Sequence, residues 1–241
     1  MKPFIIIKAG STFPTIRQRL GDFEDWIIHE IGSTDVAITV VNAMDGEALP
    51  SVDAISGVII TGSPAMVTDK DGWMQVLTAW IPQVLERNIP LLGICFGHQL
   101  LAEAMGGYSD YHPKGREMGT VSIQLTPEGK QDKLLGTLPD DFPAHTTHVQ
   151  TVIKLPADAL RLAENSFEIH HAFRLGDNAW GVQFHPEFSA DIMSAYVSEQ
   201  TATLLKEGHN VAELTAAIGN TDAANTLLKR FMTIVQETSL S

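Results

Sequence analysis

The chain has a single cysteine, Cys95, which lies where the apolar run of residues 90–94 leads into a Gly-x-Cys-x-Gly turn. In a nucleophile elbow a strand stops abruptly, the nucleophile occupies a strained turn, and a helix leaves at once, so that the reactive atom is exposed above the sheet. Gly93 and Gly97 permit such a crowded backbone because glycine carries no Cβ. Residues 90–99 therefore predict an elbow whose nucleophile is a sulfur atom.

A structural role is the alternative interpretation for this thiol, since a buried cysteine can act as a small hydrophobic side chain. One cysteine forms no internal disulfide, and no CxxC or Cys/His cluster has the spacing of zinc ligands. A nucleophilic thiolate needs a base, and His185 directly follows the apolar run 180–184. Residues two apart in an extended segment project to the same side, so Glu187 can orient this imidazole. Cys95, His185 and Glu187 are thus the predicted nucleophile, base and orienting carboxylate.

Composition excludes several classes of function. With 241 residues, 44% of them hydrophobic and 19% charged, the chain can bury a full core within one domain. Its formal net charge of −13 disfavours binding to nucleic acid and to acidic membrane surfaces. The first apolar run ends at Lys8, too early for a signal peptide, and no stretch approaches the roughly 18 to 20 apolar residues of a membrane span. We expect a cytoplasmic protein that binds neither nucleic acid nor membrane.

Short apolar runs alternate with helix-like stretches through the first hundred residues. The runs are nearly continuous in hydrophobicity, which favours parallel strands covered on both faces; they lie at 4–8, 36–42, 57–61 and 90–94. The predicted helices lie at 16–31, at 73–87, where Pro82 predicts a kink or an early end, and at 99–105, directly after the elbow.

The pattern changes after residue 120. Shorter pieces predict antiparallel additions to the sheet at 120–125, 151–155, 169–175 and 180–184, and the segment 190–238 predicts two or three helices. No internal repeat or linker interrupts the chain. We therefore expect one α/β domain over 1–241, with a mostly parallel central sheet flanked by helices, antiparallel additions and a helical C-terminal extension over 190–241.

Three sequence blocks, in the same order, resemble those of the class I (triad) glutamine amidotransferases. They are GVIITGSP at 57–64, similar to the family's oxyanion loop; the elbow at 93–99; and GVQFHPE at 181–187. The first two look closest to the amidotransferase domain of GMP synthase. The resemblance implies a flavodoxin-like architecture. It also implies that Cys95 attacks the side-chain amide of glutamine, that ammonia leaves with a proton from His185, and that water hydrolyses the γ-glutamyl thioester to glutamate.

Further site residues follow from the same resemblance. Backbone N–H groups of Phe96 and of the Gly62-Ser63 turn are expected to hold the oxyanion, with Ser63 standing where the family usually has a second glycine. Gln99 matches a position that helps to bind glutamine. The segment 144–148 falls where relatives often carry a Ser-His-Gly-Asp pocket loop, so His145 and Thr146 are expected to contact the substrate. Residues 116–119 resemble another loop beside the pocket.

The remaining histidines have simpler interpretations. His98 is expected to contact neighbouring backbone, because the base position is already filled. The pairs His170 with His171 and His145 with His148 have no Cys, Asp or Glu at ligand spacing beside them. Neither a metal site nor a cofactor is expected.

Three alternatives to a glutamine amidotransferase remain open. A γ-glutamyl peptide or amide hydrolase would use the same triad. A thiol protein or chaperone with a cysteine elbow would not need Glu187, and an inactive regulatory module would have lost a triad residue. Only 54 of the 241 residues follow Glu187, too few for an ATP-binding synthetase domain. The expected ligand is glutamine or another γ-glutamyl small molecule, and ammonia would pass to a separate synthetase subunit.

Overall fold

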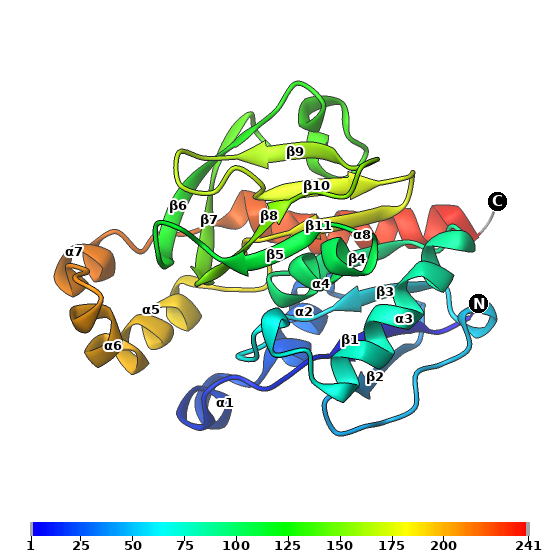
Figure 1. The fold of residues 1–241 in the computed structure, drawn as a ribbon, viewed down its shortest axis with the longest axis horizontal. Helices are drawn as coiled ribbons and strands as arrows, with labels where there is room; N and C mark the ends of the chain where they lie inside the picture. The colour runs from blue at the N-terminus through cyan, green and yellow to red at the C-terminus, as the bar shows by residue number, and fades with distance from the viewer. Residues whose placement is uncertain (1, 240–241) are drawn as a thin grey trace.

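The computed structural model describes residues 2–239. Met1, Leu240 and Ser241 belong to the predicted 1–241 domain, and the last two to the predicted extension, but they lie outside the described residues. Figure 1 shows a twisted sheet through the middle of the molecule, with helices in front of it, behind it and at one end.

The strands and helices have the following bounds. Five strands form the parallel part of the sheet: β1 (Phe4–Lys8), β2 (Ile38–Asn42), β3 (Gly57–Ile60), β4 (Leu91–Ile94) and β11 (Ala179–Val182). The antiparallel strands are β6 (Glu117–Leu125), β7 (Asp141–His148), β9 (Leu160–Glu164) and β10 (Ala172–Leu175), and a separate pair consists of β5 (Tyr108–Tyr111) and β8 (Gln150–Lys154). The helices are α1 (Pro14–Leu20), α2 (Phe23–Ile31), α3 (Gly72–Glu86), α4 (Phe96–Ala104), α5 (Ala190–Glu199), α6 (Thr201–Lys206), α7 (Val211–Ala216) and α8 (Asp222–Ser239).

Within the described range the main sheet has the strand order β2-β1-β3-β4-β11-β10-β9-β6-β7. Pairing is parallel from β2 to β11 and antiparallel from β11 to β7. The predicted α/β class, with a parallel centre and antiparallel additions, is confirmed. The order 2-1-3-4 places the reversal of winding between β1 and β3, where open α/β sheets bind ligands beyond the carboxyl ends of their strands.

Strand β1 shows why its sequence is apolar at every position. Phe4 and Ile6 belong to a core cluster that includes side chains of α2 and α8, whereas Ile5 and Ile7 pack in a second cluster with α3 and α4. Figure 1 shows α3 and α4 in front of the sheet and α2 and α8 behind it. Both faces of β1 are therefore covered, whereas the edge strand β2 keeps Thr39 and Val40 exposed.

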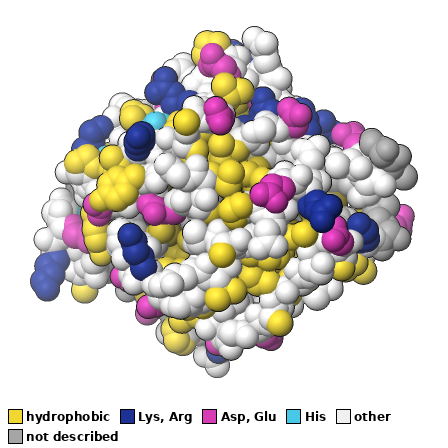
Figure 2. Space-filling model, turned by 45° about the vertical axis from the view of Figure 1, so that its right-hand side comes forward, with side chains coloured by type: hydrophobic (Ala, Val, Ile, Leu, Met, Phe, Trp, Pro, Cys, Tyr) yellow, Lys and Arg dark blue, Asp and Glu magenta, His cyan; other side chains and the backbone are white. Residues whose placement is uncertain are grey.

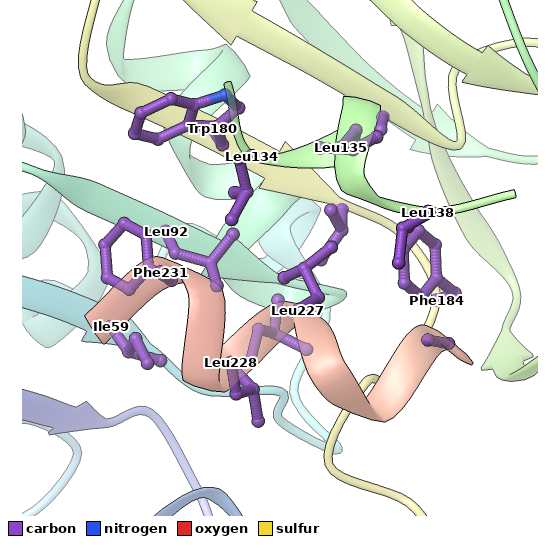
Figure 3. Packing of buried hydrophobic residues seen from close by; sticks show 14 of the residues in the cluster. Ile59, Leu92, Leu134, Leu135, Leu138, Trp180, Phe184, Leu227, Leu228 and Phe231 are labelled. Atoms are coloured by element: carbon purple, nitrogen blue, oxygen red, sulfur yellow. The ribbon is translucent and has the colours of Figure 1, made fainter. Parts of the chain in front are cut away.

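Helix α8 supplies much of one core face. Leu227, Leu228 and Phe231 project from it toward the sheet (Figure 3), and all three are fully buried. The Phe231 ring meets the rings of Phe4 and Trp180 edge-on, with centroids 6.2 and 6.0 Å apart. Helices α5 to α7 lie at the opposite end of the molecule from the chain termini (Figure 1), and α5 packs on Phe23, Trp26 and Phe188 in a third cluster.

The predicted helices differ from the observed ones in three places. The segment 16–31 forms two helices, because Gly21 adopts φ 86° and the Asp22 carboxylate caps α2. Pro82 does not end α3, which continues to Glu86 and keeps Ile81 and Val84 in the core. Helix α4 starts at Phe96, three residues earlier than predicted, since the elbow leads into it without a linker.

Three strand predictions were also wrong in detail. The run 180–184, predicted as an antiparallel addition, corresponds to β11, which pairs in parallel with β4 and is antiparallel only to β10. Residues 150–154 form β8, which pairs with β5 instead of joining the main sheet, and the strand predicted at 169–175 is confined to Ala172–Leu175. The C-terminal segment holds four helices within the described residues, not two or three.

Surface features match the acidic composition. On the face shown in Figure 2, Lys and Arg alternate with Asp and Glu around a central area of hydrophobic side chains, so no large part of this face is basic. No helix in residues 2–239 is both long and apolar enough to cross a membrane.

Candidate active site

The predicted triad and oxyanion residues come from the carboxyl ends of three adjacent parallel strands. Gly62 and Ser63 follow β3, Cys95 follows β4, and His185 follows β11. Strands β4 and β11 pair in parallel with Val182 opposite Ile94. This register brings the segments that carry the cysteine and the histidine to the same edge of the sheet.

Cys95 occupies the strained turn that an elbow requires. Its backbone angles are φ 50° and ψ −96°, a conformation that L-residues rarely adopt and that costs on the order of 1–3 kcal/mol. A Cβ on Gly93 would lie 2.3 Å from the Gly97 carbonyl oxygen, and one on Gly97 would lie 2.5 Å from the Ile60 carbonyl oxygen. The Cys95 amide donates to the Val182 carbonyl at 2.8 Å. The two glycines therefore let strand, turn and helix approach within contact distance.

His185 and Glu187 form a buried pair. Their Nδ1 and Oε1 atoms are 2.7 Å apart, and the two residues are 2% and 1% exposed. The His185 ring stacks on Phe188 with centroids 4.1 Å apart, and Gly62 lies so close that a Cβ there would be 2.9 Å from Cε1. Because Glu187 occupies Nδ1, Nε2 is the nitrogen available to the Cys95 thiol.

The surroundings of His185 favour its charged form. Complete burial lowers the pKa of His185, but the charges of Glu187 and Cys95 and hydrogen bonds with both raise it to about 10. An imidazolium at this position is the natural partner of a thiolate. The imidazole of His185 is therefore suited to exchange a proton with the Cys95 side chain, with which it forms a hydrogen bond.

Phe96 and Ser63 are the predicted sources of N–H groups for the oxyanion. Phe96 is the first residue of α4, so its amide has no acceptor within the helix, and the helix dipole adds a partial positive charge. The Ser63 hydroxyl donates to the Ala9 carbonyl at 2.8 Å and accepts from the Ala65 amide at 3.0 Å. The serine side chain is thus bonded within the loop.

A cavity of about 390 Å³ opens beside Cys95 and His185. The residues of its wall belong to the segments that follow β1, β3 and β4, to the end of β7 and to α5. Arg116, just before β6, also lines it. The lining residues are Ser11, Thr12, Phe13, Pro14, Phe23, Ser63, Pro64, Ala65, Met66, Cys95, Phe96, Gln99, Arg116, Thr147, His148, Val149, Gln150, His185, Tyr196 and Gln200. Reactive groups and a mostly apolar wall share one enclosed space, as is usual for small-molecule sites.

The sequence also matches known proteins. A family model described as glutamine amidotransferase class-I matches residues 20–202. The chain belongs to this family. The matched range contains the three blocks on which the predicted resemblance rests, and that resemblance is confirmed.

Individual relatives differ in how much of their length the chain covers. GMP synthase [glutamine-hydrolyzing] of Thermosipho africanus is 36% identical over 60% of this chain but only 27% of its own length. Gamma-glutamyl peptidase 5 of Arabidopsis thaliana is 24% identical over 96% of this chain and 95% of its own. A glutamine amidotransferase structure from Thermotoga maritima superposes with a TM-score of 0.77 over 98% of this chain and 99% of its own, at 20% identity, and so shares the fold.

Of the three residues predicted to bind substrate, only Gln99 lines the cavity. Its Nε2 donates to the Gln150 carbonyl at 2.8 Å and to Gln183 Oε1 at 2.9 Å. His145 and Thr146 do not line the cavity; they lie in the interior of strand β7 instead of the expected loop, and both are fully buried. Only the carboxyl end of this strand, at Thr147 and His148, reaches the cavity.

His145 supports the site from behind the wall. Its carbonyl accepts from the His185 amide at 2.8 Å, and its Nδ1 lies 3.2 Å from Thr120 Oγ1. Burial and the charge of His185 lower the pKa of His145 to about 4, so this imidazole is neutral at pH 7. His98 is also fully buried, with its ring 4.8 Å from that of Phe173. Burial lowers the pKa of His98 well below its ordinary value, as expected for a structural histidine.

Several wall residues escaped the sequence analysis. Thr12 lies just after β1, and its Oγ1 is 2.7 Å from the Tyr196 hydroxyl on α5, while Asp22 accepts from the Thr12 amide at 2.8 Å. The rule that ligands bind at the carboxyl ends of parallel strands could have identified the segment after β1. Tyr196 and Gln200 have no local signal, because only the tertiary packing of α5 brings them to the cavity.

A buried charge cluster lies behind the end of β7. Glu117 Oε2 is 3.1 Å from His148 Nε2 and 3.2 Å from His171 Nε2, and Glu117 Oε1 accepts from Asn165 at 2.8 Å. Burial raises the pKa of Glu117, but hydrogen bonds with the two histidines outweigh it and hold that pKa well below the ordinary range. Glu117 is therefore a carboxylate at neutral pH. Within the described residues, no group of three or more His, Cys, Asp and Glu is arranged to hold a metal ion.

Proposed function

We propose that the chain is a Cys-His-Glu thiol hydrolase that cleaves γ-glutamyl amide bonds, with the side-chain amide of glutamine as the simplest substrate. The observation that carries the proposal is the position of Cys95 on a strained elbow, beside a buried His185–Glu187 pair and at the wall of a cavity. Membership of the class-I glutamine amidotransferase family supports the same chemistry.

The proposed reaction has two halves. The Cys95 thiolate attacks the γ-carbonyl carbon, and the tetrahedral oxyanion accepts hydrogen bonds from the Phe96 amide and from the Gly62-Ser63 turn. Collapse breaks the C–N bond as the imidazolium of His185 gives its proton to the leaving nitrogen. His185 then takes a proton from water, the hydroxide attacks the thioester, and glutamate leaves as the thiolate is restored. Glu187 keeps the ring oriented throughout.

Substrate contacts are assigned by position. Gln99, His148 and Gln150 lie side by side on the wall, because Gln99 Nε2 and His148 Nδ1 both bond the Gln150 carbonyl, at 2.8 and 2.9 Å. We place the glutamyl part of the substrate against these residues. His145 and Thr146 lie outside the wall and would act through the backbone of His185 and through β7.

The two candidate leaving groups are ammonia and a larger amine. Ammonia release would suit delivery to a separate synthetase subunit, and the GMP synthase relatives combine a matching segment with a much longer chain. Cleavage of γ-glutamyl peptides is favoured by the match to gamma-glutamyl peptidase 5 over nearly its whole length and by a cavity that extends past the thiol to Phe13, Pro14 and Tyr196. Both leaving groups need the same triad.

A nucleophile test decides whether this chemistry occurs at Cys95. Glutamate release from glutamine and from a panel of γ-glutamyl compounds is measured for wild-type protein and for Cys95→Ala. We expect the substitution to lower kcat by a factor of about 10⁴ or more, with an unchanged circular dichroism spectrum. A glutamine-like chloroketone should label wild-type protein at Cys95 and leave Cys95→Ala unlabelled. Retained turnover or labelling in Cys95→Ala would contradict the proposal.

A further inference from the structure

The charged groups that line the cavity are all potentially cationic. The chain has 29 Asp and Glu against 16 Lys and Arg, yet the lining contains no carboxylate side chain. It contains Arg116 and the imidazoles of His148 and His185. A wall of this kind in an acidic protein selects for anionic groups on the ligand.

Arg116 is held in place from one side. Its Nε and Nη2 atoms donate to the two carboxylate oxygens of Glu207 at 2.8 and 3.2 Å, and Nη1 donates to Gln200 Oε1 at 3.2 Å. The side chain is 14% exposed, and hydrogen bonding to Arg116 lowers the pKa of Glu207, which keeps the ion pair intact at neutral pH. Three of the five guanidinium N–H donors are thus occupied, and two remain for a ligand.

His148 also lines the cavity, and both of its ring nitrogens have partners. Its Nδ1 lies 2.9 Å from the Gln150 carbonyl, and its Nε2 lies 3.1 Å from the Glu117 carboxylate. His171 Nε2 also faces Glu117 at 3.2 Å, and Asn165 donates to the other oxygen of that carboxylate. The negative charge of Glu117 therefore lies behind His148, away from the cavity.

Arg116 and His148 lie near each other on the wall, because Glu117, the residue after Arg116, is opposite His148 in the β6–β7 pairing, but they bond different neighbours. His148 bonds the Gln150 carbonyl, which also accepts from Gln99 on the elbow helix. Arg116 is instead tied to Gln200 at the end of α5 and to Glu207 after α6, on the side that carries Tyr196. Glutamine has one carboxylate, whereas a γ-glutamyl amino acid has one on each side of the scissile bond. Arg116, with two free N–H donors, is the side chain of the wall that a second carboxylate can meet.

We propose that Arg116 binds a carboxylate on the leaving group, so that the preferred substrates are γ-glutamyl amino acids or peptides with a free C-terminal carboxylate. This inference rests on the thiol chemistry of the proposed function. The bond that breaks is the γ-glutamyl C–N bond, the amine of the departing amino acid takes the proton from His185, and water releases glutamate. Glu207 and Gln200 act as positioning residues for the guanidinium, which then loses little freedom on binding.

The test compares γ-glutamylglycine, its C-terminal amide and glutamine as substrates. A hydrogen bond to a charged partner suggests that wild-type protein prefers the acid to the amide by a factor of about 10–100 in kcat/KM. In Arg116→Gln this ratio of acid to amide should fall toward 1. Arg116→Lys should keep only part of the preference for the acid, because an ammonium group cannot donate two parallel hydrogen bonds to a carboxylate. Glu207→Gln should raise KM for the acid more than it lowers kcat.

Lys114→Gln is the matched control. This exposed lysine precedes β6 on the same loop, bonds the Ser166 carbonyl and does not line the cavity, so its loss should leave the ratio of acid to amide unchanged. An equal wild-type rate on acid and amide would overturn the inference. So would an equal loss in Arg116→Gln on all three substrates, which would assign Arg116 to the glutamyl α-carboxylate or to the fold. Failure of the proposed function is a separate result, because chloroketone labelling of Cys95 does not depend on the leaving group.

Discussion

Glu187 acts on the reaction only through His185. Its carboxylate fixes Nδ1 at 2.7 Å, and its charge is the largest of the effects that raise the pKa of the imidazole. Gly62 and Phe188 confine the ring from the sides, so the carboxylate determines both the orientation and the charge of the base. Removing the ring and removing its partner should therefore have different consequences.

We expect Glu187→Gln to lower the pKa of His185 below its value of about 10 and to reduce kcat/KM by a factor of about 10²–10⁴. His185→Ala should reduce activity further, because proton transfer is then lost. The same pKa shift affects stability. The pKa of His185 is about 10 in the folded protein and near 6.5 in the unfolded chain, so protonated His185 stabilises the fold. This contribution to the free energy of unfolding is fully present below pH 6.5 and is lost as the pH rises through 10. That loss should be smaller in Glu187→Gln. NMR titration of the histidine Cε1–H signals measures the pKa, and an unchanged value would assign the raised pKa to another group.

The residues of the triad could be predicted because each stands beside a local signal. Glycines flank Cys95, and the apolar strand before His185 predicts an extended end from which Glu187 projects to the same side. Which residues of 144–148 line the cavity could not be predicted in the same way. No glycine or proline marks the end of β7 after Pro143, so the sequence does not show that the wall starts at Thr147.

Strand β4, the turn at Cys95 and helix α4 behave as one element. Gly93 lets β4 approach the backbone at Gly97, and Gly97 lets α4 approach the end of β3 at Ile60. At both positions an added Cβ would overlap a carbonyl oxygen. Backbone atoms cannot move aside as the end of a flexible side chain can. The geometry of the thiol therefore depends on glycine at both positions.

Gly93→Ala should destabilise the protein by about 1–3 kcal/mol or more and reduce activity, since its Cβ would lie 2.3 Å from the Gly97 carbonyl oxygen. Urea unfolding with glutamate release as the activity assay measures both effects. Gly72→Ala is the control, because Gly72 begins α3 with no heavy atom within 4 Å of the added Cβ and alanine favours helix. Equal stability of the two variants would show that the elbow relaxes around the new atom.

Element types were predictable where periodicity was strong, and their ends and partners were not. Continuous apolar runs identified β1, β3 and β4 as parallel strands because both of their faces are covered, whereas β11 was expected to be antiparallel. The division of 16–31 follows from Gly21 and the Asp22 cap, a signal that is present in the sequence but weaker than the apolar period. The pairing of β8 with β5 depends on tertiary contacts, which no local sequence pattern predicts.

At the scale of the whole molecule, the C-terminal segment has two separate roles. Helix α8 closes the core over β1, β3, β4 and β11, and α5 with the residue after α6 completes the cavity through Tyr196, Gln200 and the Glu207 contact with Arg116. The segment is therefore part of both the fold and the site. Substitutions in α8 should affect stability, whereas those near α6 should affect substrate choice.

Phe231→Ala tests the structural half of this division. The ring is fully buried between Phe4 and Trp180, so its removal leaves a cavity between α8 and the sheet and should cost about 3–5 kcal/mol of unfolding free energy. Because the fold is otherwise kept, the ratio of acid to amide cleavage should not change in the folded fraction. Lys229→Ala, at an exposed position on the same helix, should change the unfolding free energy by less than about 0.5 kcal/mol. Urea unfolding of both variants measures the difference, and a loss below about 1 kcal/mol for Phe231→Ala would mean that α8 is not an essential wall of the core.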